Sequence, residues 1–507
     1  MLVTGIVGFV MLPLNLKHLG VELYGISALA VSTLTLFTFL RMGMQPALLR
    51  FFSHAVAEKD HEKLRSLSSM SQLLLGGLGF IGAVGFLCVY PWFVSLYEVH
   101  ETVRWDLLIL FLAIAFDFWA NLFLIPFTGI IQASNRFDIG NMQQCFAKIL
   151  RLVVLYVGYS FFSPSLLILA AATFAGTFWQ LASLVFLAWR IHGIAIFFHR
   201  KSLCWSFLPP LFSFSALNLI HEVSMGLSMQ IPVLIIGRTL GVDMVAAFAP
   251  ALLLSSFCYS ILSQISVPLV PIASKDVIEN QGKNMGYWAI RIGEIVACIS
   301  CSIVVVFVLF GSEIITVWLG ESLAWTGAIV TITVTGIVLA DIQTTNYRLA
   351  LGSNVSIVPL ALSSVVLTIV TSLGTFLGSA YGGWSLLHVA SFIALIRLIR
   401  SVFFLAFWYS RQIGYGFVEY TWHVYVKSLL LGLAVIGIFY PLKWQLSFSL
   451  ARIPILGLSS LLVTGVYLSL CWKFILPQKV KNSMLQLVTS KFVRATGATN
   501  EVKHDAE

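Results

Sequence analysis

The chain reads Leu19-Gly20-Val21-Glu22 near its start and Leu240-Gly241-Val242-Asp243 near its middle, each time beside a long apolar stretch. Ser134-Asn135 likewise returns as Ser353-Asn354. The two matches lie 221 and 219 residues apart. Such similar spacing indicates two copies of one unit of about 220 residues. In a membrane protein, duplicated halves are typical of a transporter that rocks one half against the other.

The composition is that of a membrane protein. Of the 507 residues, 59% are hydrophobic and only 10% are charged, whereas soluble domains carry about 25% charged residues. Apolar stretches long enough to cross a bilayer as helices recur throughout the chain. We therefore expect an all-α integral membrane protein. The net charge is +9, but the basic residues gather in short loops, where they set topology, and so indicate no nucleic-acid partner.

Fourteen segments are predicted to cross the membrane. Their approximate bounds are 2–16, 22–49, 68–95, 105–131, 137–162, 164–189, 208–236, 243–271, 287–310, 324–350, 353–379, 384–409, 422–441 and 453–475. Twenty lysines and arginines lie in the C-terminal tail or in and beside the loops after even-numbered segments, and five lie in loops after odd-numbered ones. Because cationic loops stay in the cytoplasm, we expect a multi-pass protein of the cell inner membrane with both termini cytoplasmic.

These segments group into two parallel repeats, because six crossings per copy leave both copies in the same orientation. We therefore expect two lobes of six helices each, followed by two extra helices. The expected parts are an N-lobe at 1–190, a cytoplasmic linker at 191–207, a C-lobe at 208–410, two further helices at 411–475 and a cytoplasmic amphipathic tail at 476–507.

The sequence offers little for enzymatic chemistry. No loop is much longer than about twenty residues, which leaves no room for a soluble catalytic domain. Cys298 and Cys301 form a C-x-x-C pair without a second pair, so we expect no metal site there. We expect no enzyme, no catalytic residue and no cofactor.

Ionisable side chains fall near the middle of several predicted helices, where each costs about 2.5–3.5 kcal/mol unless it is paired or hydrated. The cations are Arg41, Lys148, Arg151, Arg397 and Arg400, and the anions are Asp117, Glu222 and Asp341. Because the cations outnumber the anions, a shared interior favours an anionic guest. Guanidinium forks match the oxygens of a phosphate.

The spacing of these charges supports such an interior. Polar residues recur at helical spacing in three stripes, which contain Gln144, Lys148 and Arg151, then Ser215, Asn218 and Glu222, then Asp341, Thr344, Thr345 and Arg348. Polar stripes on otherwise apolar helices predict that these faces meet around water. We expect Arg348 to join the cations that bind the substrate.

An alternative reading assigns the same charges to ion pairs that lock helices together, for example Lys148 with Asp117 and Arg397 with Glu222. Arg41 and Arg400 also have side chains long enough to reach the cytoplasmic surface. The acidic residues Asp117, Glu222 and Asp341 are candidates for coupling or gating. His221, beside Glu222, is either a proton relay that joins them or a hydrogen-bonded packing residue.

Three runs of sequence resemble a known family. They are LGVELYG at 19–25, MGMQPALLRF at 42–51 and IQASNRF at 131–137. Together they resemble polysaccharide flippases, whose superfamily also holds multidrug and toxic compound extrusion (MATE) transporters and lipid II flippases. The resemblance implies a V-shaped pair of six-helix lobes. It also implies an oligosaccharide on undecaprenyl diphosphate that is turned from the cytoplasmic to the outer leaflet.

We therefore expect a flippase for a lipid-linked oligosaccharide that works by alternating access, with the diphosphate held by the cations. Membrane lipids and glycan-assembly proteins are the other expected partners, and Na⁺ or H⁺ is the candidate coupling ion. One alternative is a cation-coupled multidrug extruder of the same fold, which needs acidic residues to dominate the interior. Another is a membrane glycan polymerase or ligase, which needs a sizeable outer loop.

Overall fold

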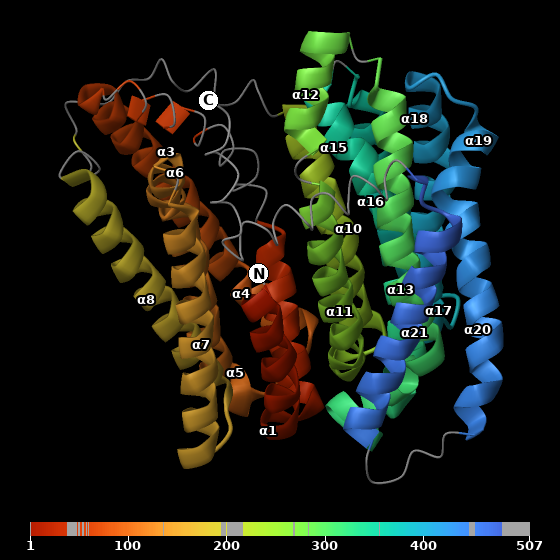
Figure 1. Cartoon of the computed structure of the whole chain (residues 1–507). Coiled ribbons are helices and arrows are strands. Elements are labelled where there is room, and N and C mark those ends of the chain that lie inside the picture. The colour runs from red at the N-terminus through yellow and green to blue at the C-terminus, as the bar shows by residue number, and fades with distance from the viewer. Residues whose placement is uncertain are drawn as a thin grey trace, which may run out of the picture. The chain divides into compact units, whose positions relative to one another are not determined.

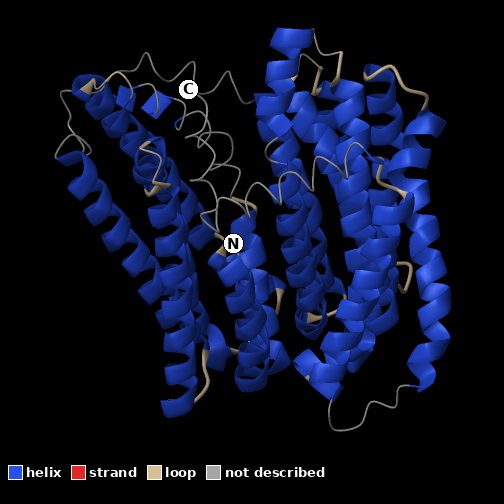
Figure 2. Ribbon diagram, viewed as in Figure 1, coloured by secondary structure: helices blue, strands red, loops and turns tan. Residues whose placement is uncertain are grey.

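The computed structural model describes residues 2–37, 60–134, 136–193, 216–266, 269–281, 283–353, 355–445 and 452–478, with residues 48, 51, 52, 55, 56, 58 and 199. Within these residues the protein is helical and contains no strand (Figure 2). Thirteen described helices are long and apolar enough to cross a membrane. The predicted all-α membrane fold is therefore confirmed.

The first two predicted segments appear as one element, α1 (Leu2–Thr35), with a kink at Gly20. At this residue φ is 79° and ψ is 173°, so two helical arms meet at a non-helical position. This is why thirteen helices are counted where fourteen segments were predicted. Gly241, the counterpart of Gly20 in the second copy, also has a positive φ of 103°. Both copies of the motif therefore use a glycine for a left-handed backbone.

The chain divides into two compact units. Unit 1 holds Met1–Phe257, Ala328–Thr333 and Ser356–Ile396, and unit 2 holds Cys258–Gly327, Val334–Val355 and Arg397–Glu507. The elements of unit 1 include α1, α3 (His61–Cys88), α4 (Tyr90–Leu96), α5 (Glu101–Phe123), α6 (Ile125–Ala133), α7 (Phe137–Phe161), α8 (Leu166–His192), α10 (Ala216–Thr239) and α16 (Val358–Ala380). The helices α11 (Val242–Ser266), α14 (Gly327–Ala340) and α17 (Leu386–Leu398) pass from unit 1 into unit 2.

Unit 1 is built on a small set of helix pairs (Figure 1). In the first copy, α5 packs between α3 and α8, α7 packs on α8, and α1 packs on α7. In the second copy, α10 packs on α16, and α10 also contacts α1. Prolines begin two of the short helices, Pro91 in α4 and Pro126 in α6. A proline suits the first turn of a helix because its missing N–H has no partner there.

Unit 2 is organised around the long helix α13 (Met285–Leu319), which packs against several neighbours. The other elements of unit 2 are α12 (Leu269–Asn280), η5 (Glu321–Thr326), η6 (Asp341–Gln343), α15 (Thr344–Gly352), η7 (Ile399–Leu405), α18 (Ala406–Gln412), α19 (Phe417–Thr421), η8 (Trp422–Val426), α20 (Lys427–Gln445) and α21 (Arg452–Phe474). Two of these, η7 and η8, are π-helical turns, and η6 is a 3₁₀ turn. The predicted lobe boundaries stay predictions, and the predicted tail beyond residue 478 lies outside the described residues.

Candidate functional site

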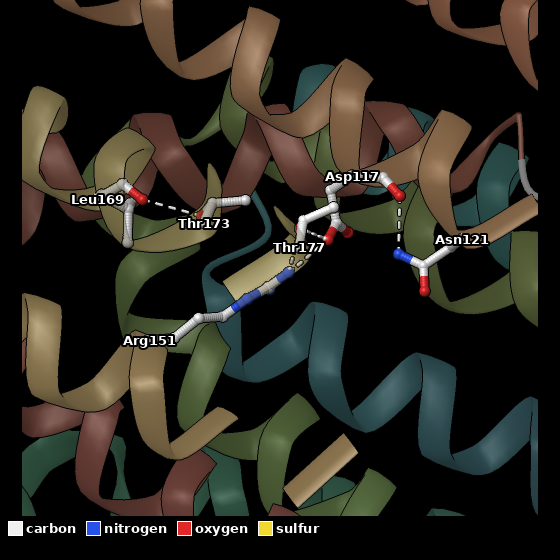
Figure 3. Close-up of polar contacts among 6 residues, drawn as sticks. All are labelled: Asp117, Asn121, Arg151, Leu169, Thr173 and Thr177. Carbon is white, nitrogen blue, oxygen red and sulfur yellow. Dashed lines mark hydrogen bonds and ion pairs between the residues drawn. The ribbon is translucent and has the colours of Figure 1, made fainter. Parts of the chain in front are cut away.

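The first intramembrane charge cluster lies in unit 1 and joins three helices (Figure 3). Arg151 of α7 forms an ion pair with Asp117 of α5. The same guanidinium nitrogen of Arg151 donates to Thr177 Oγ1 of α8 at 2.8 Å, and the Thr177 hydroxyl donates to the Asp117 carboxylate. Asn121 completes the group by donating to the Asp117 carbonyl at 2.7 Å. The charges of Asp117 and Arg151 therefore balance within the helix bundle.

Sequence reasoning proposed Lys148, not Arg151, as the alternative partner of Asp117, and the structure corrects this pairing. Lys148 lies three residues before Arg151 on α7, nearly one turn away, and its side chain is exposed. Among the ion pairs of the described residues, none involves Lys148. Lys148 is therefore the cation of this cluster that keeps an exposed ammonium group.

The second cluster lies in unit 2, around Asp341. Asp341 is 6% exposed and Arg397 is 3% exposed. The carboxylate of Asp341 interacts through its charge with both Arg397 and Arg400. Arg397, in the last turn of α17, interacts through its charge with Asp341, while its alternative pairing with Glu222 stays a prediction. Two guanidinium groups thus act on one carboxylate, and Arg400 is the more exposed of the two.

Three departures from α-helical geometry meet at this second cluster. Where α14 ends, the carbonyl of Ala340 accepts a hydrogen bond from Ser401 Oγ of η7 at 2.6 Å. Gln343 of η6 donates to the hydroxyl of Tyr425 of η8 at 3.0 Å. The 3₁₀ turn and both π-helical turns are therefore held together by side chains. Such π turns are frequent at functional sites.

The second cluster also contains buried oxygens without a hydrogen-bond partner among the described residues. They are Asp341 Oδ2, Thr345 Oγ1 and Asn346 Oδ1. Each such atom costs about 1–3 kcal/mol when it stays unsatisfied. The amide nitrogen of Asn346, in contrast, donates to Tyr420 at 2.6 Å. These oxygens therefore have free capacity to accept hydrogen bonds from a small polar guest beside the Asp341 carboxylate.

His221 and Glu222 lie on α10 in unit 1. His221 is buried, and its Nδ1 lies 2.6 Å from Ser364 Oγ of α16. Because the Ser364 hydroxyl donates to the carbonyl of Leu360 at 2.9 Å, it accepts from His221, whose Nδ1 then carries the proton. This bond ties α10 to α16 and favours the packing role over the relay. The side chain of Glu222 is partly buried beside it.

The remaining predicted site residues are Arg348 and Arg41. Arg348 is partly buried on α15 in unit 2, and its guanidinium lies 5.3 Å from the ring centre of Tyr347. Arg41 lies outside the described residues, as do Asn135, Asn354 and Ser215 of the predicted motifs and stripes. Of the other predicted residues, Asp117, Lys148 and Arg151 lie at the first cluster in unit 1 and Asp341, Arg397 and Arg400 at the second cluster in unit 2, while His221 and Glu222 of unit 1 belong to neither.

Sequence reasoning missed a third polar group, which we call the Tyr97 latch: Tyr97 and Glu98 of the α4–α5 turn with Leu234 and Arg238 of α10. The Tyr97 hydroxyl donates to the Leu234 carbonyl at 3.2 Å. Burial raises the pKa of Tyr97 to about 12, so the hydroxyl stays a donor at neutral pH. Arg238 pairs with Glu98 at 3.3 Å.

The backbone at the Tyr97 latch is strained. Glu98 has a φ of 52°, which for a residue with a Cβ costs about 1–3 kcal/mol. Gly237 leaves the space for this contact, since a Cβ there would lie 2.7 Å from Leu29 and 3.1 Å from the Tyr97 ring. The latch therefore joins the first copy of the repeat to the first helix of the second. No sequence pattern links residues 97 and 234, because the packing of α10 against the α4–α5 turn brings them together.

The comparisons with known proteins agree with the predicted resemblance. A family model described as "Polysaccharide biosynthesis protein" matches residues 1–276. The uncharacterized membrane protein EpsK of Bacillus subtilis (strain 168) is 23% identical over 508 residues, which cover 97% of this chain and 95% of EpsK. These matches connect the chain with polysaccharide biosynthesis.

Two solved structures share the fold. The lipid II flippase MurJ in an inward closed conformation has a TM-score of 0.66 at 13% identity, over 93% of this chain and 97% of MurJ. A multidrug resistance MATE family transporter of the MOP superfamily, inward-facing, has a TM-score of 0.65 at 13% identity, over 81% of this chain and 94% of that one. The fold is thus that of two-lobe transporters, and the chain belongs to the polysaccharide biosynthesis protein family.

Proposed function

We propose that this protein is a flippase that turns an undecaprenyl-diphosphate-linked oligosaccharide from the cytoplasmic to the outer leaflet by alternating access. The family and the transporter fold support a polysaccharide flippase. The observation that carries the finer proposal is the excess of cations in each cluster. Lys148 accompanies the balanced pair Asp117–Arg151, and two arginines accompany Asp341.

The two clusters assign different roles to the cations. The guanidinium of Arg151 is held by Asp117 and Thr177. We therefore assign it the role of fixing α7 against its neighbours and of adding positive charge, not of binding the phosphate directly. Lys148 in unit 1 and Arg400 in unit 2 are the more exposed cations of their clusters, and we propose that each cluster contacts the diphosphate through this cation. Cations in a dry environment bind phosphate oxygens more strongly than in water, because less charge is screened. Arg348 and Arg397 add to the positive charge around Arg400 within unit 2, and Arg41 stays a predicted substrate-binding cation.

Asp341 is the acidic residue that we propose for coupling to Na⁺ or H⁺. Asp341 Oδ2 and the side-chain oxygens of Thr345 and Asn346 make no hydrogen bond among the described residues. Oxygen donors are the ligands that hard cations prefer. Binding of the ion here would offset part of the carboxylate charge that holds Arg397. A ligand shifts the inward–outward balance only by its difference in affinity for the two states.

We propose that the Tyr97 latch is a contact that opens and closes during alternating access. In the proposed orientation, with both termini in the cytoplasm of a cell with an inner membrane, α4 and α10 end at the outer side. The latch would then hold the outer end of unit 1 closed while the substrate enters from the cytoplasm. We propose that Glu98 leaves its positive φ when the contact opens, which would lower the free energy of the outward-open state.

The second candidate function is multidrug extrusion, which the shared fold of the MATE transporter favours. An extruder of cationic drugs needs an acid with an unbalanced charge in its interior. Asp117 is balanced by Arg151, and Asp341 faces two arginines. The charges therefore favour an anionic substrate over a cationic one.

The test is glycan export by a deletion strain that expresses single variants. Lys148→Ala and Arg400→Ala are expected to lower the amount of surface glycan strongly, while Lys148→Arg restores it because the charge returns. Lys275→Ala is the matched control, since Lys275 is a solvent-exposed lysine on α12 that pairs with Glu279. Normal export by both alanine variants, at normal membrane levels, would exclude the cationic site. Hypersensitivity of the deletion strain to cationic drugs, with normal glycan, would favour the extruder.

A further inference from the structure

An apolar groove of about 550 Å³ runs between α1 and α7 within unit 1. Its lining includes Val10, Pro13 and Lys17 of α1 and Leu152, Val153 and Tyr156 of α7. The size is within the range of about 300–1,000 Å³ that is common for ligand sites. Val153 is 50% exposed and Tyr156 is 65% exposed, so the groove is open along its length to whatever lies beside these helices.

The backbone and the neighbouring contacts keep this groove open. Pro13 lies inside α1 and has no N–H to donate, so the carbonyl one turn before it lacks its usual helical partner. Tyr159 holds the two helices at a fixed separation: its hydroxyl donates to Asn15 Oδ1 at 3.1 Å, and its ring stacks on His18 with 4.9 Å between centroids. The groove is therefore formed before any guest arrives, which lowers the entropic cost of binding.

Lys17 gives the groove a charged end. It is exposed, and none of the ion pairs of the described residues involves it. It lies seven residues from Val10, or roughly 10 Å along an α-helix, and three residues before the kink at Gly20 where the first arm of α1 ends. An ammonium at the end of a membrane helix lies at headgroup level, while the rest of the groove lies among hydrocarbon chains.

A second groove shows that this combination is specific. It runs between α5 and α8, measures about 390 Å³, and is lined by Phe123, Leu181, Ala182, Val185, Phe186 and Trp189. This lining contains no charged side chain. It can hold a hydrocarbon chain but offers nothing to a headgroup. The α1–α7 groove offers both an apolar channel and a cation at its end.

We propose that the α1–α7 groove binds the isoprenoid chain of the carrier lipid, with the phosphate of that lipid on Lys17. The proposal rests on the proposed function and extends it, because it says where the carrier is held at the membrane surface, beside the end of the first arm of α1. A diphosphate bears more negative charge than the single phosphodiester of a phospholipid. The attraction to one ammonium group scales with that charge, so Lys17 favours the carrier over the surrounding lipid.

The test uses the full-length protein in nanodiscs and a farnesyl diphosphate analogue with a photoreactive benzophenone at the end of its chain. Cross-linked peptides identified by mass spectrometry are expected to come from α1 and α7 around the groove. Val153→Trp, which fills the groove, is expected to lower this labelling by about tenfold, in line with the cost of overpacking. Lys17→Gln is expected to lower it several-fold and to remove its dependence on salt.

The matched control is Val157→Trp, because Val157 is 44% exposed on the same helix but is absent from the groove lining. Its labelling is expected to equal that of the unchanged protein, and undecaprenyl phosphate is expected to compete. Equal competition by phosphatidylglycerol, or equal labelling of the α5–α8 groove, would overturn the proposal, because either result describes ordinary lipid contact. If the groove stays unlabelled while export is normal, this inference fails and the flippase stands. If the groove is labelled but a strain that lacks the protein still exports glycan normally, the flippase proposal is wrong and the lipid-binding groove stands.

Discussion

Arg151 reaches Asp117 only because residue 176 has no side chain. A Cβ on Gly176 of α8 would lie 2.4 Å from Arg151 Cγ and 2.6 Å from Arg151 Nε. Those distances are far inside van der Waals contact, so any larger residue displaces the arginine. The ion pair at the centre of the first cluster therefore depends on a glycine from a third helix.

This relationship predicts that Gly176→Ala destabilises the protein by about 1–3 kcal/mol, because it overpacks the helix contact. Equilibrium unfolding in sodium dodecyl sulfate measures the change. Gly77→Ala on α3 is the control, since a Cβ there meets nothing within 4 Å, and it is expected to be neutral or slightly stabilising. Equal effects of the two substitutions would show that Arg151 does not need the space.

The pair itself predicts strong coupling in a double-mutant cycle. Asp117→Asn is expected to cost about 1–3 kcal/mol, because it leaves the guanidinium of Arg151 with a poorer partner. Arg151→Gln alone leaves the carboxylate and costs a similar amount. The double variant is expected to cost less than the sum of the two, by at least about 0.5 kcal/mol. Additive effects in the same unfolding assay would mean that the charges do not stabilise each other.

The second cluster predicts unequal roles for its two arginines. Arg397→Gln is expected to destabilise the protein by about 3–5 kcal/mol, because it leaves the buried carboxylate of Asp341 without its buried cation. Arg400→Gln is expected to cost much less stability, since Arg400 is more exposed. The unfolding assay and membrane levels measure both. Equal losses would argue against the separation of a structural arginine from a substrate-binding one.

The Tyr97 latch predicts a conformational lock. In a cysteine-free background, Glu98→Cys and Arg238→Cys joined by a short, reducible cross-linker are expected to stop glycan export, because α10 can no longer leave the α4–α5 turn. Reduction is expected to restore export. Glu101→Cys with Arg104→Cys is the control, because both residues are exposed on the first turn of α5, form an ion pair at 3.4 Å and need not separate. Export that continues through the cross-linked latch would show that this contact stays closed throughout the cycle.

The sequence alone predicts the helices well and the contacts poorly. Apolar length decides where a membrane helix lies, so the segment expected at 164–189 appears as α8 (Leu166–His192) and the one expected at 353–379 as α16 (Val358–Ala380). The repeated Leu-Gly-Val motif places Gly20 and Gly241 at equivalent positions of the two copies, and the backbone has a positive φ at both. The segments predicted at 2–16 and 22–49 correspond to the two helical arms of α1, which meet at the non-helical Gly20.

The charges were found because their surroundings are apolar, yet their partners could not be predicted from spacing. Lys148 and Arg151 lie three residues apart on one helix, and only the position of α8, with its Gly176, decides which one meets Asp117. The same holds for Arg397, whose neighbour Asp341 is brought near by a 3₁₀ turn and a π turn. These irregular turns have no periodic signature, and the Tyr97 latch joins residues 137 positions apart.

The central claim is that Lys148 in unit 1 and Arg400 in unit 2 each contact phosphates of the carrier lipid. The most direct measurement is binding of undecaprenyl diphosphate to the purified protein in nanodiscs. We predict that Lys148→Ala combined with Arg400→Ala weakens binding by about tenfold or more, equivalent to about 1.4 kcal/mol, and flattens its salt dependence. Lys275→Ala is predicted to leave both unchanged. Wild-type affinity and wild-type salt dependence in the folded double variant would contradict the account.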